Sequence, residues 1–108
     1  LYLLESRLAM KPHDRDMIVM IHEVEYEMGN RKEKLTSSLV VKGTDNLHTA
    51  MAKTVGTPLA IGAILVLEGK INLIGLHIPV VPEIYNPVLE ELRKNGIEFN
   101  EKTEIISQ

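Results

Sequence analysis

The sequence predicts a mixed α/β unit that combines an antiparallel hairpin with buried helices. Two stretches with alternating apolar residues, 16–28 and 35–42, are separated by turn residues, which is typical of a β-hairpin. A long helical pattern, apolar on nearly every side, follows over residues 46–69. A shorter amphipathic helix and a weakly alternating final stretch, 97–106, complete an order that is typical of mixed α/β folds.

Composition limits the classes of function. A chain of 108 residues forms one domain or part of one. Only 4% of the residues are aromatic, so we expect an aliphatic core. The net charge of −3 argues against a nucleic-acid surface, which needs a basic stripe. There is no cysteine, which excludes disulfides, thiolate catalysis and cysteine-based metal sites, and a reducing cytoplasm fits.

The ends and apolar runs of the chain lead to two further expectations. The longest apolar run, 59–67, is shorter than the roughly 20 residues that span a bilayer, so no membrane contact is expected. The sequence starts at Leu1 rather than methionine and contains no glycine-rich phosphate loop. We therefore expect it to be the tail of a longer protein.

The N-terminal part predicts a helix end and then the hairpin. Residues 1–10 carry leucines at helical spacing, and residues 11–14 form a turn. In the strand 16–28 the even-numbered face is largely apolar, whereas the odd-numbered face is apolar at first and acidic from Glu23 onward. We expect one end of this strand to be buried on both faces and the other to meet water.

The long helix has a predicted start, an interruption and a predicted end. Asp45 is a candidate N-cap, and Gly69 a candidate stop. Gly56 and Pro58 interrupt the pattern, because an internal proline removes a donor and costs about 3 kcal/mol. The second half, 59–67, is apolar all round and should be buried on most faces.

The C-terminal third predicts a short strand at 71–74 and an irregular loop. A helix then begins at Pro82, because proline and a following glutamate suit the first helical turn. It should end at the Asn95-Gly96 pair. Its apolar stripe consists of Ile84, Val88, Leu89 and Leu92.

Three residues are candidates for contact with a substrate or an interface. His22 lies mid-strand on the apolar face, where it is either a proton-transfer group or, as we favour, a core histidine. Lys53 precedes the break in the long helix and could reach an anionic ligand. Thr54 could hydrogen bond back to a carbonyl and so relieve the break.

Other polar groups have simpler interpretations. Glu23, Glu25 and Glu27 share a strand face and could bind a cation or an amine, but a solvated face is the favoured interpretation. Arg15 could pair with a substrate carboxylate, or it could simply be solvated on its turn. The four histidines show no metal-ligand spacing, so no metal site is expected.

Three motifs in order resemble the saccharopine dehydrogenase family. Residues 15–23, RDMIVMIHE, resemble its RDM-hydrophobic-HE strand. Residues 50–58, AMAKTVGTP, resemble its AMAKTVGLP signature, although Thr57 replaces the usual leucine. Residues 83–92, EIYNPVLEEL, followed by a Gly-Ile pair, resemble its C-terminal EIYxPILEEL helix and strand. The similarity is greatest to the glutamate-forming branch and to its bacterial members.

The resemblance implies a fold and an activity. The whole enzyme would have an N-terminal Rossmann domain that binds NADP or NAD, followed by a glyceraldehyde-3-phosphate-dehydrogenase-like domain that supplies much of the saccharopine site and the dimer contact. Residues of about 8–82 would end that second domain, and about 83–108 would return to the Rossmann domain. The reaction is hydride transfer between saccharopine and NAD(P) with imine hydrolysis.

The same resemblance implies that the catalytic and cofactor-binding residues lie upstream, so none is assigned in this chain. The chain would serve as a scaffold and dimer interface and would be inactive alone. The loop 76–79 departs from the GVxGP form of eukaryotic members, which argues against the bifunctional eukaryotic enzyme. Two alternatives stay open. One is a stand-alone dimerisation or ligand-binding module, and the other is a related dehydrogenase acting on another amine such as carboxynorspermidine.

Overall fold

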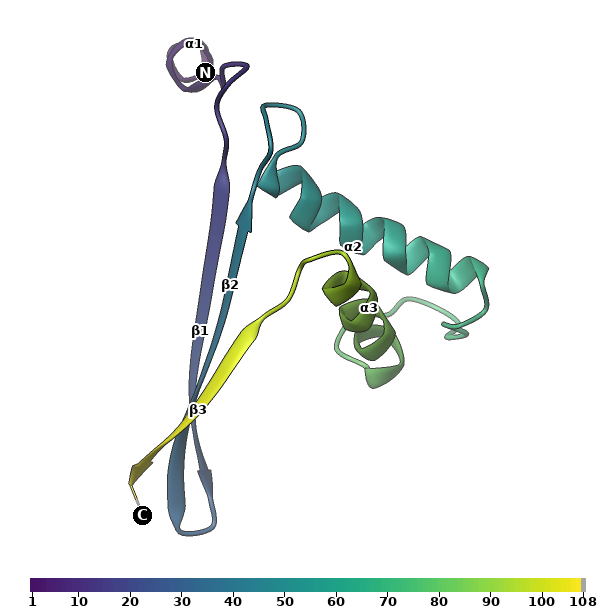
Figure 1. The fold of residues 1–108 in the computed structure, drawn as a ribbon. Helices are drawn as coiled ribbons and strands as arrows, with labels where there is room; N and C mark the ends of the chain where they lie inside the picture. Colours follow the sequence, from purple (N-terminus) through teal and green to yellow (C-terminus); the bar gives the residue numbers. More distant parts are fainter. Residues whose placement is uncertain (108) are drawn as a thin grey trace.

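The computed structural model describes residues 1–107 and contains three helices and three strands within that range (Figure 1). They follow one another as α1 (Tyr2–Leu8), β1 (Met17–Met28), β2 (Arg31–Lys42), α2 (Ala50–Leu67), α3 (Pro82–Lys94) and β3 (Asn100–Ser107). The strands form one antiparallel sheet in the order β1-β2-β3. The predicted mixed α/β class with an antiparallel hairpin is confirmed.

The hairpin closes through a two-residue turn at Gly29 and Asn30. Gly29 has a φ of +63°, a left-handed conformation that favours glycine. Pairing therefore resumes at once, with Met28 opposite Arg31. The prediction that the second strand begins at residue 35 is wrong, because the charged residues 31–34 belong to the ladder.

The inner face of the sheet meets the helices at one end only. Ile18, Leu39 and Val41 lie in the apolar core there. At the other end of the same face, the Tyr26 hydroxyl donates to the Glu33 carboxylate at 2.7 Å, and Glu33 is buried. This hydrogen bond raises the pKa of Tyr26.

The outer face of the sheet changes character along its length. At one end it carries the outer sheet patch, which consists of Met17, Val19, Ile21 and Val40 and is exposed in this chain. The expectation that this end of β1 is buried on both faces is therefore wrong for the chain alone. At the other end, Glu23 pairs with Lys34 at 2.8 Å and Glu25 with Lys32 at 3.2 Å. The acidic stripe is thus balanced by lysines across the strand.

The helix α2 begins four residues later than predicted. Its N-cap is Thr49, whose hydroxyl accepts a hydrogen bond from the Ala52 amide at 2.9 Å. Asp45, the predicted cap, instead accepts from the amides of Leu47 and His48 and closes a tight turn. These hydrogen bonds resemble a helix cap, but residues 46–48 do not continue into a helix, and α2 starts only after Thr49.

Pro58 lies inside α2 without ending it. Proline cannot donate to the carbonyl of Thr54, four residues earlier. One turn before, the Thr54 hydroxyl donates to the Ala50 carbonyl at 2.9 Å, as predicted. The helix stays continuous from Ala50 to Leu67 and ends at Gly69, whose φ is +71°. The predicted stop is confirmed.

The burial of α2 differs from the prediction. Its buried residues are Ala50, Ile61 and Leu65, whereas Leu59 and Leu67 are 75% and 86% exposed. The expectation that its second half is buried on most faces is therefore wrong within this chain. With 18 residues, α2 is also long and apolar enough to cross a membrane, by length and composition alone. The expectation of no membrane contact considered only the nine-residue apolar run 59–67, whereas the helix also includes residues 50–58.

Residues 70–81 run from α2 to α3 without a strand, so the strand predicted at 71–74 is wrong. The reason lies in the helix end. The amides of Lys70 and Ile71 both donate back to the Leu65 carbonyl, at 2.9 and 3.2 Å, and are not available to a sheet.

The helix α3 begins at Pro82, as predicted, and packs against α2. Ile84 and Val88 lie against the core and Leu92 is buried, whereas Leu89 is half exposed. Gly96, with a φ of +76°, turns the chain towards β3, which begins three residues later than predicted. The proposed domain boundary near residue 82 stays a prediction; here α3 packs on α2, and β3 pairs with β2.

Replacing Gly43 should destabilise the fold. A Cβ there would collide with the Asp16 carboxylate and lie 3.0 Å from the Ala50 amide nitrogen. We expect Gly43→Ala to lower the free energy of unfolding by about 1–3 kcal/mol, as overpacking does. Urea unfolding of the purified protein measures this.

The matched control is Gly56→Ala, because a Cβ on Gly56 meets nothing within 4 Å in this chain. In a helix this change should be neutral or stabilising by up to about 1 kcal/mol. Equal effects of the two substitutions would contradict the close approach at Gly43.

Candidate functional site

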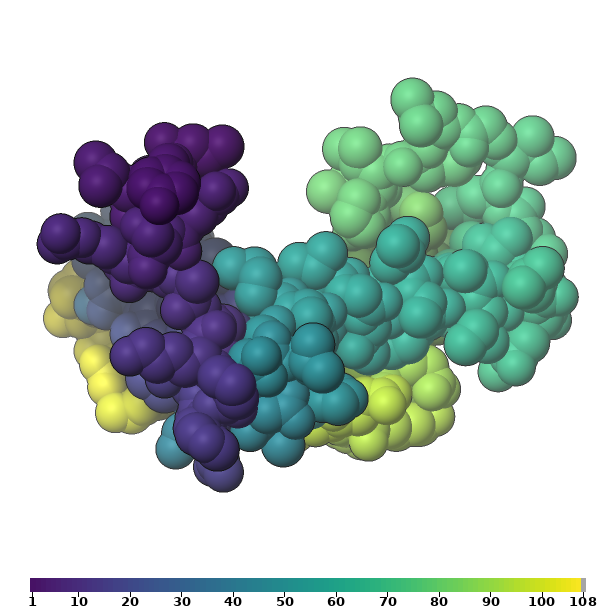
Figure 2. All heavy atoms as spheres, turned by 90° about the horizontal axis from the view of Figure 1, so that it is seen from above, coloured from purple at the N-terminus to yellow at the C-terminus, as the bar shows by residue number. Residues whose placement is uncertain are grey.

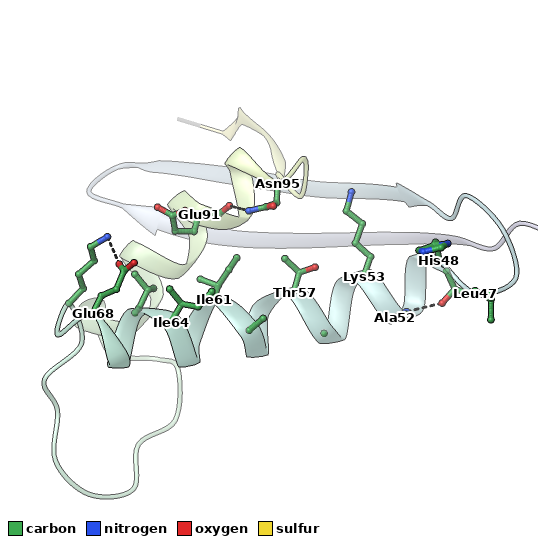
Figure 3. Close-up of a pocket in the computed structure, with 15 residues that line it drawn as sticks. Leu47, His48, Ala52, Lys53, Thr57, Ile61, Ile64, Glu68, Glu91 and Asn95 are labelled. Carbon is green, nitrogen blue, oxygen red and sulfur yellow. Dashed lines mark hydrogen bonds and ion pairs between the residues drawn. The ribbon is translucent and has the colours of Figure 1, made fainter.

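A groove of about 690 Å³ lies between α2 and α3 (Figure 3). The α2 helix forms its floor along most of its length, and the C-terminal part of α3 forms a wall. The floor is apolar and partly small, with Ala52, Gly56 and Ala60 recurring every fourth residue. This spacing places all three on one side of the helix, where another group can approach the backbone closely.

Lys53 is the charged group at the open end of the groove. Its side chain extends from α2 towards the end of α3, and its Nζ lies 3.8 Å from the point where a Cβ on Gly96 would stand. Within residues 1–107 it forms no ion pair. Thr57, one turn further along α2, points to the same side. This end could accept an anionic group.

The far end of the groove is charged but internally paired. Glu68 and Lys70 form an ion pair at 2.7 Å, and Glu91 pairs with Lys94 at 2.7 Å. The hydrogen bond from Lys94 lowers the pKa of Glu91, and the one with Glu68 raises the pKa of Lys70. Because each carboxylate already has a cation, this end has little charge left for a ligand.

The N-terminus of α2 is held by an acidic residue from the start of the hairpin. The carboxylate of Asp16 accepts hydrogen bonds from the amides of Ala50 at 2.6 Å and Met51 at 2.9 Å. The Asp16 carbonyl also accepts from the Gly43 amide at 2.8 Å. The two α2 amides hold the pKa of Asp16 below its usual value of 3.8.

Asp45 and His48 form a pair beside the groove. The Asp45 carboxylate accepts from the amides of His48 at 2.7 Å and Leu47 at 2.8 Å, and lies 3.0 Å from His48 Nδ1. These contacts lower the pKa of Asp45 to about 2. The carboxylate is therefore occupied in shaping the loop that leads into α2.

The structure separates the three predicted site residues. Lys53 lines the groove, and Thr54 is bonded to the helix backbone. His22 is exposed on β1, with its ring tilted at 47° to that of Phe99 and the centroids 6.1 Å apart. The interpretation of His22 as a core histidine is wrong for this chain, because α2 and α3 cover only one end of the inner face. Whether any of the three contacts a substrate stays a prediction.

Sequence reasoning missed Asp16, which it took as the first residue of the predicted strand 16–28. Its role depends on a contact 34 residues away, which local patterns do not reveal. The local signals for this contact were weak. An acidic residue stands directly before a strand, and the first turn of α2 has no acid of its own to complement the helix dipole.

The described residues contain hydrogen-bonding and charged groups but no catalytic constellation. His48 pairs with Asp45, and no hydroxyl group among residues 1–107 bonds to that imidazole. No group of three or more metal-ligating side chains occurs in the same range. What the groove offers a bound group is an apolar floor and, at one end, the side chains of Lys53 and Thr57.

Comparison with known proteins gives one family. A model of the saccharopine dehydrogenase C-terminal domain matches residues 1–97. The alpha-aminoadipic semialdehyde synthase of Arabidopsis thaliana is 44% identical over 108 residues, covering 95% of this chain and 10% of that protein. The saccharopine dehydrogenase [NADP(+), L-glutamate-forming] of Saccharomyces cerevisiae is 40% identical over 102 residues, covering 93% of this chain and 23% of that protein.

A solved structure agrees with both sequence matches. The apo histidine-tagged saccharopine dehydrogenase (L-Glu forming) from Saccharomyces cerevisiae superimposes with a TM-score of 0.87 at 39% identity. The match covers 94% of this chain and 23% of that one. The chain thus spans between a tenth and a quarter of the length of these relatives.

Stability should fall in acid through Asp16. The folded state lowers the pKa of Asp16. Its contribution to the free energy of unfolding is therefore complete above the pKa of the unfolded chain, and it is lost as the pH falls through the pKa of the folded state. We expect Asp16→Asn to be less stable at about pH 6, and its loss of stability towards about pH 3 to be shallower. Thermal unfolding at a series of pH values measures both, with exposed Glu27→Gln as the control. Parallel pH profiles for Asp16→Asn and the unmodified protein would contradict the anchor.

Proposed function

The chain belongs to the saccharopine dehydrogenase C-terminal domain family, and from this premise we propose that it is the C-terminal segment of an NAD(P)-dependent saccharopine dehydrogenase. The observation that carries the proposal is the joint match of sequence and fold, 39% identity at a TM-score of 0.87 over 94% of the chain. The reaction is the oxidative cleavage or reductive formation of saccharopine in lysine metabolism. In the cleaving direction, the carbon next to the secondary amine would give a hydride to NAD(P)+ and the nitrogen would lose a proton. Water would then add to the resulting imine, which cleaves to glutamate and aminoadipate semialdehyde.

Within that enzyme the segment serves as a scaffold and is inactive alone. Two features support this role. The described residues bring no nucleophile, base and orienting group together, and the candidate residues His22 and Lys53 lie on separate elements. The structured features are instead a sheet, a helix pair and uncovered apolar surfaces. The proton and hydride transfers therefore belong to residues outside this segment.

NADP or NAD is bound by a domain outside the segment as well. Dinucleotide phosphates bind at a helix N-terminus with free amides, preceded by a glycine-rich turn. The first amides of α2 are taken by the Asp16 carboxylate, and α3 begins at Pro82, which has no amide hydrogen. A pyrophosphate group does not fit at either helix.

The finer assignment follows the sequence motifs. We infer the glutamate-forming, monofunctional type with bacterial-like features, from the loop 76–79, which lacks the form common in eukaryotic members. A cytoplasmic location is part of the same proposal and is compatible with a chain without cysteine.

We further propose that the enzyme is a homodimer whose interface includes the outer sheet patch. Its four residues are adjacent on the ladder, since Val19 lies opposite Val40. Ile21 is 62% exposed, and the helices pack on the other face of the sheet, so nothing among residues 1–107 covers the patch. A cluster of aliphatic side chains of this kind is typical of an interaction surface.

The first test is an NAD(P)-linked absorbance assay of the full-length protein with saccharopine. We expect turnover by the full-length enzyme and none by residues 1–108, because the cofactor and catalytic groups lie elsewhere. Turnover of carboxynorspermidine in place of saccharopine would move the protein to a related dehydrogenase. Saturable binding of an amino acid by a protein without turnover would support a stand-alone binding module instead.

The dimer is tested by a charge on the patch. Ile21→Lys in the full-length protein should shift the mass from dimer to monomer in light scattering, because burying an unpaired ammonium is costly. Glu27→Lys is the matched control, on the same face of β1 but at the solvated end, and should leave the dimer intact. An unchanged mass for Ile21→Lys would place the interface elsewhere.

A further inference from the structure

The segment has far more surface than a compact protein of its size. Its accessible surface is 8778 Å², whereas a folded monomer of 12.1 kDa is expected to have about 6,000 Å². Its radius of gyration is 18.3 Å, against about 13 Å for a compact domain of this length. An excess of roughly 2,800 Å² is several times the 800 Å² or so that one partner contributes to a standard interface.

Much of the uncovered apolar surface lies on one side of α2. We call this the α2 outer face, and it consists of Val55, Leu59, Gly62, Ala63, Val66 and Leu67. By helical geometry these residues lie opposite the buried residues Ile61 and Leu65. A shallow hollow runs along them, and a Cβ on Gly62 would meet nothing within 4 Å. The face is apolar, continuous and shaped for close packing.

The surroundings of α2 form a notch. Figure 2 shows the N-terminal residues on one side and the loop 70–81 on the other, with α2 running between them. The N-terminus of the described chain therefore lies at the rim of the space above α2. Any chain that precedes Leu1 would start beside this notch.

We propose that the α2 outer face is the docking surface for the part of the same polypeptide that precedes Leu1. The inference rests on the proposed function, in which this segment is under a quarter of the enzyme, as it is of the yeast chain that it matches. A helix that is apolar on all sides needs cover on all sides. In this segment α3 and the sheet cover one side of α2, and the upstream chain covers the other.

A lipid bilayer fits this face less well. Lys53 interrupts α2 in its first turn, which leaves residues 54–67 without charge. Fourteen helical residues rise about 21 Å, short of the hydrocarbon core of about 30 Å. The partner helix α3 carries Glu91 and Lys94 beside α2, and the two charges would enter the membrane with it.

A second copy of the chain accounts for less of the uncovered surface than an upstream domain does. One isologous interface on the outer sheet patch leaves α2 uncovered, because the patch lies on β1 and β2. The size of the excess surface requires more than one contact of standard size. An upstream domain of the same chain supplies a second, larger contact without a further copy.

The proposal is tested by site-specific photo-cross-linking in the full-length protein. A benzophenone amino acid replaces Leu59 in one variant and Leu67 in another, so that failure of one to fold leaves the other. The control position is Glu27, on the solvated end of the sheet. After irradiation, the products are sized under denaturing conditions and the linked peptides are identified by mass spectrometry.

We expect both α2 variants to give a product of monomer mass linked to a peptide upstream of Leu1, and the control to give none. A product of twice the mass, a lipid adduct, links confined to residues 1–108, or no product would each overturn the proposal. The saccharopine assay on the same preparations keeps the two ideas apart. Turnover without the upstream link rejects the docking surface alone, and the link without turnover on saccharopine rejects the proposed reaction alone.

Discussion

The arrangement of this segment depends on the hydrogen bonds between Asp16 and the first turn of α2. They join the start of the hairpin to the start of the long helix, two points 34 residues apart in the chain. The carboxylate satisfies two amides that no helical carbonyl can reach and complements the positive end of the helix dipole. Gly43 can lie against this carboxylate because it has no side chain. A Cβ at this position would occupy the space of the carboxylate. The angle at which α2 leaves the sheet follows from this contact.

Once α2 is anchored, the remaining elements have few alternatives. Its end at Gly69 folds the following amides back onto Leu65, so the chain continues as a loop instead of a strand. The helix α3 then lies along α2 with Leu92 buried between them and the sheet, and Ile97 continues the core into β3. The groove with Lys53 at its mouth results from the part of α2 that α3 does not reach.

The same geometry explains why the segment is incomplete as a globular unit. Among the described residues, eight buried aliphatic side chains form the core, while the outer sheet patch and the α2 outer face are uncovered. Neither apolar surface packs against another element among the described residues. In the two proposals above, a second copy would cover the outer sheet patch and the upstream polypeptide would cover the α2 outer face.

The sequence by itself determined the type of nearly every element and the family. Alternation in β1, a glycine turn, helical periodicity in α2 and the proline-led start of α3 are local properties, so the residues carry them wherever they lie. Three motifs at the correct order were enough for the family. It also anticipated the back-bond of Thr54, because that hydrogen bond follows from helix geometry.

Only the tertiary structure decided which surfaces are covered and where elements begin. The start of α2 shifted from Asp45 to Thr49 because Asp16, distant in sequence, supplies the partner for the first amides. The exposure of His22 and Leu59 depends on which elements pack nearby, and an apolar pattern states only that cover is needed. Patterns along a chain report local geometry, whereas contacts between distant residues determine which side chains are buried. The groove and the uncovered apolar faces lie where those contacts leave side chains exposed.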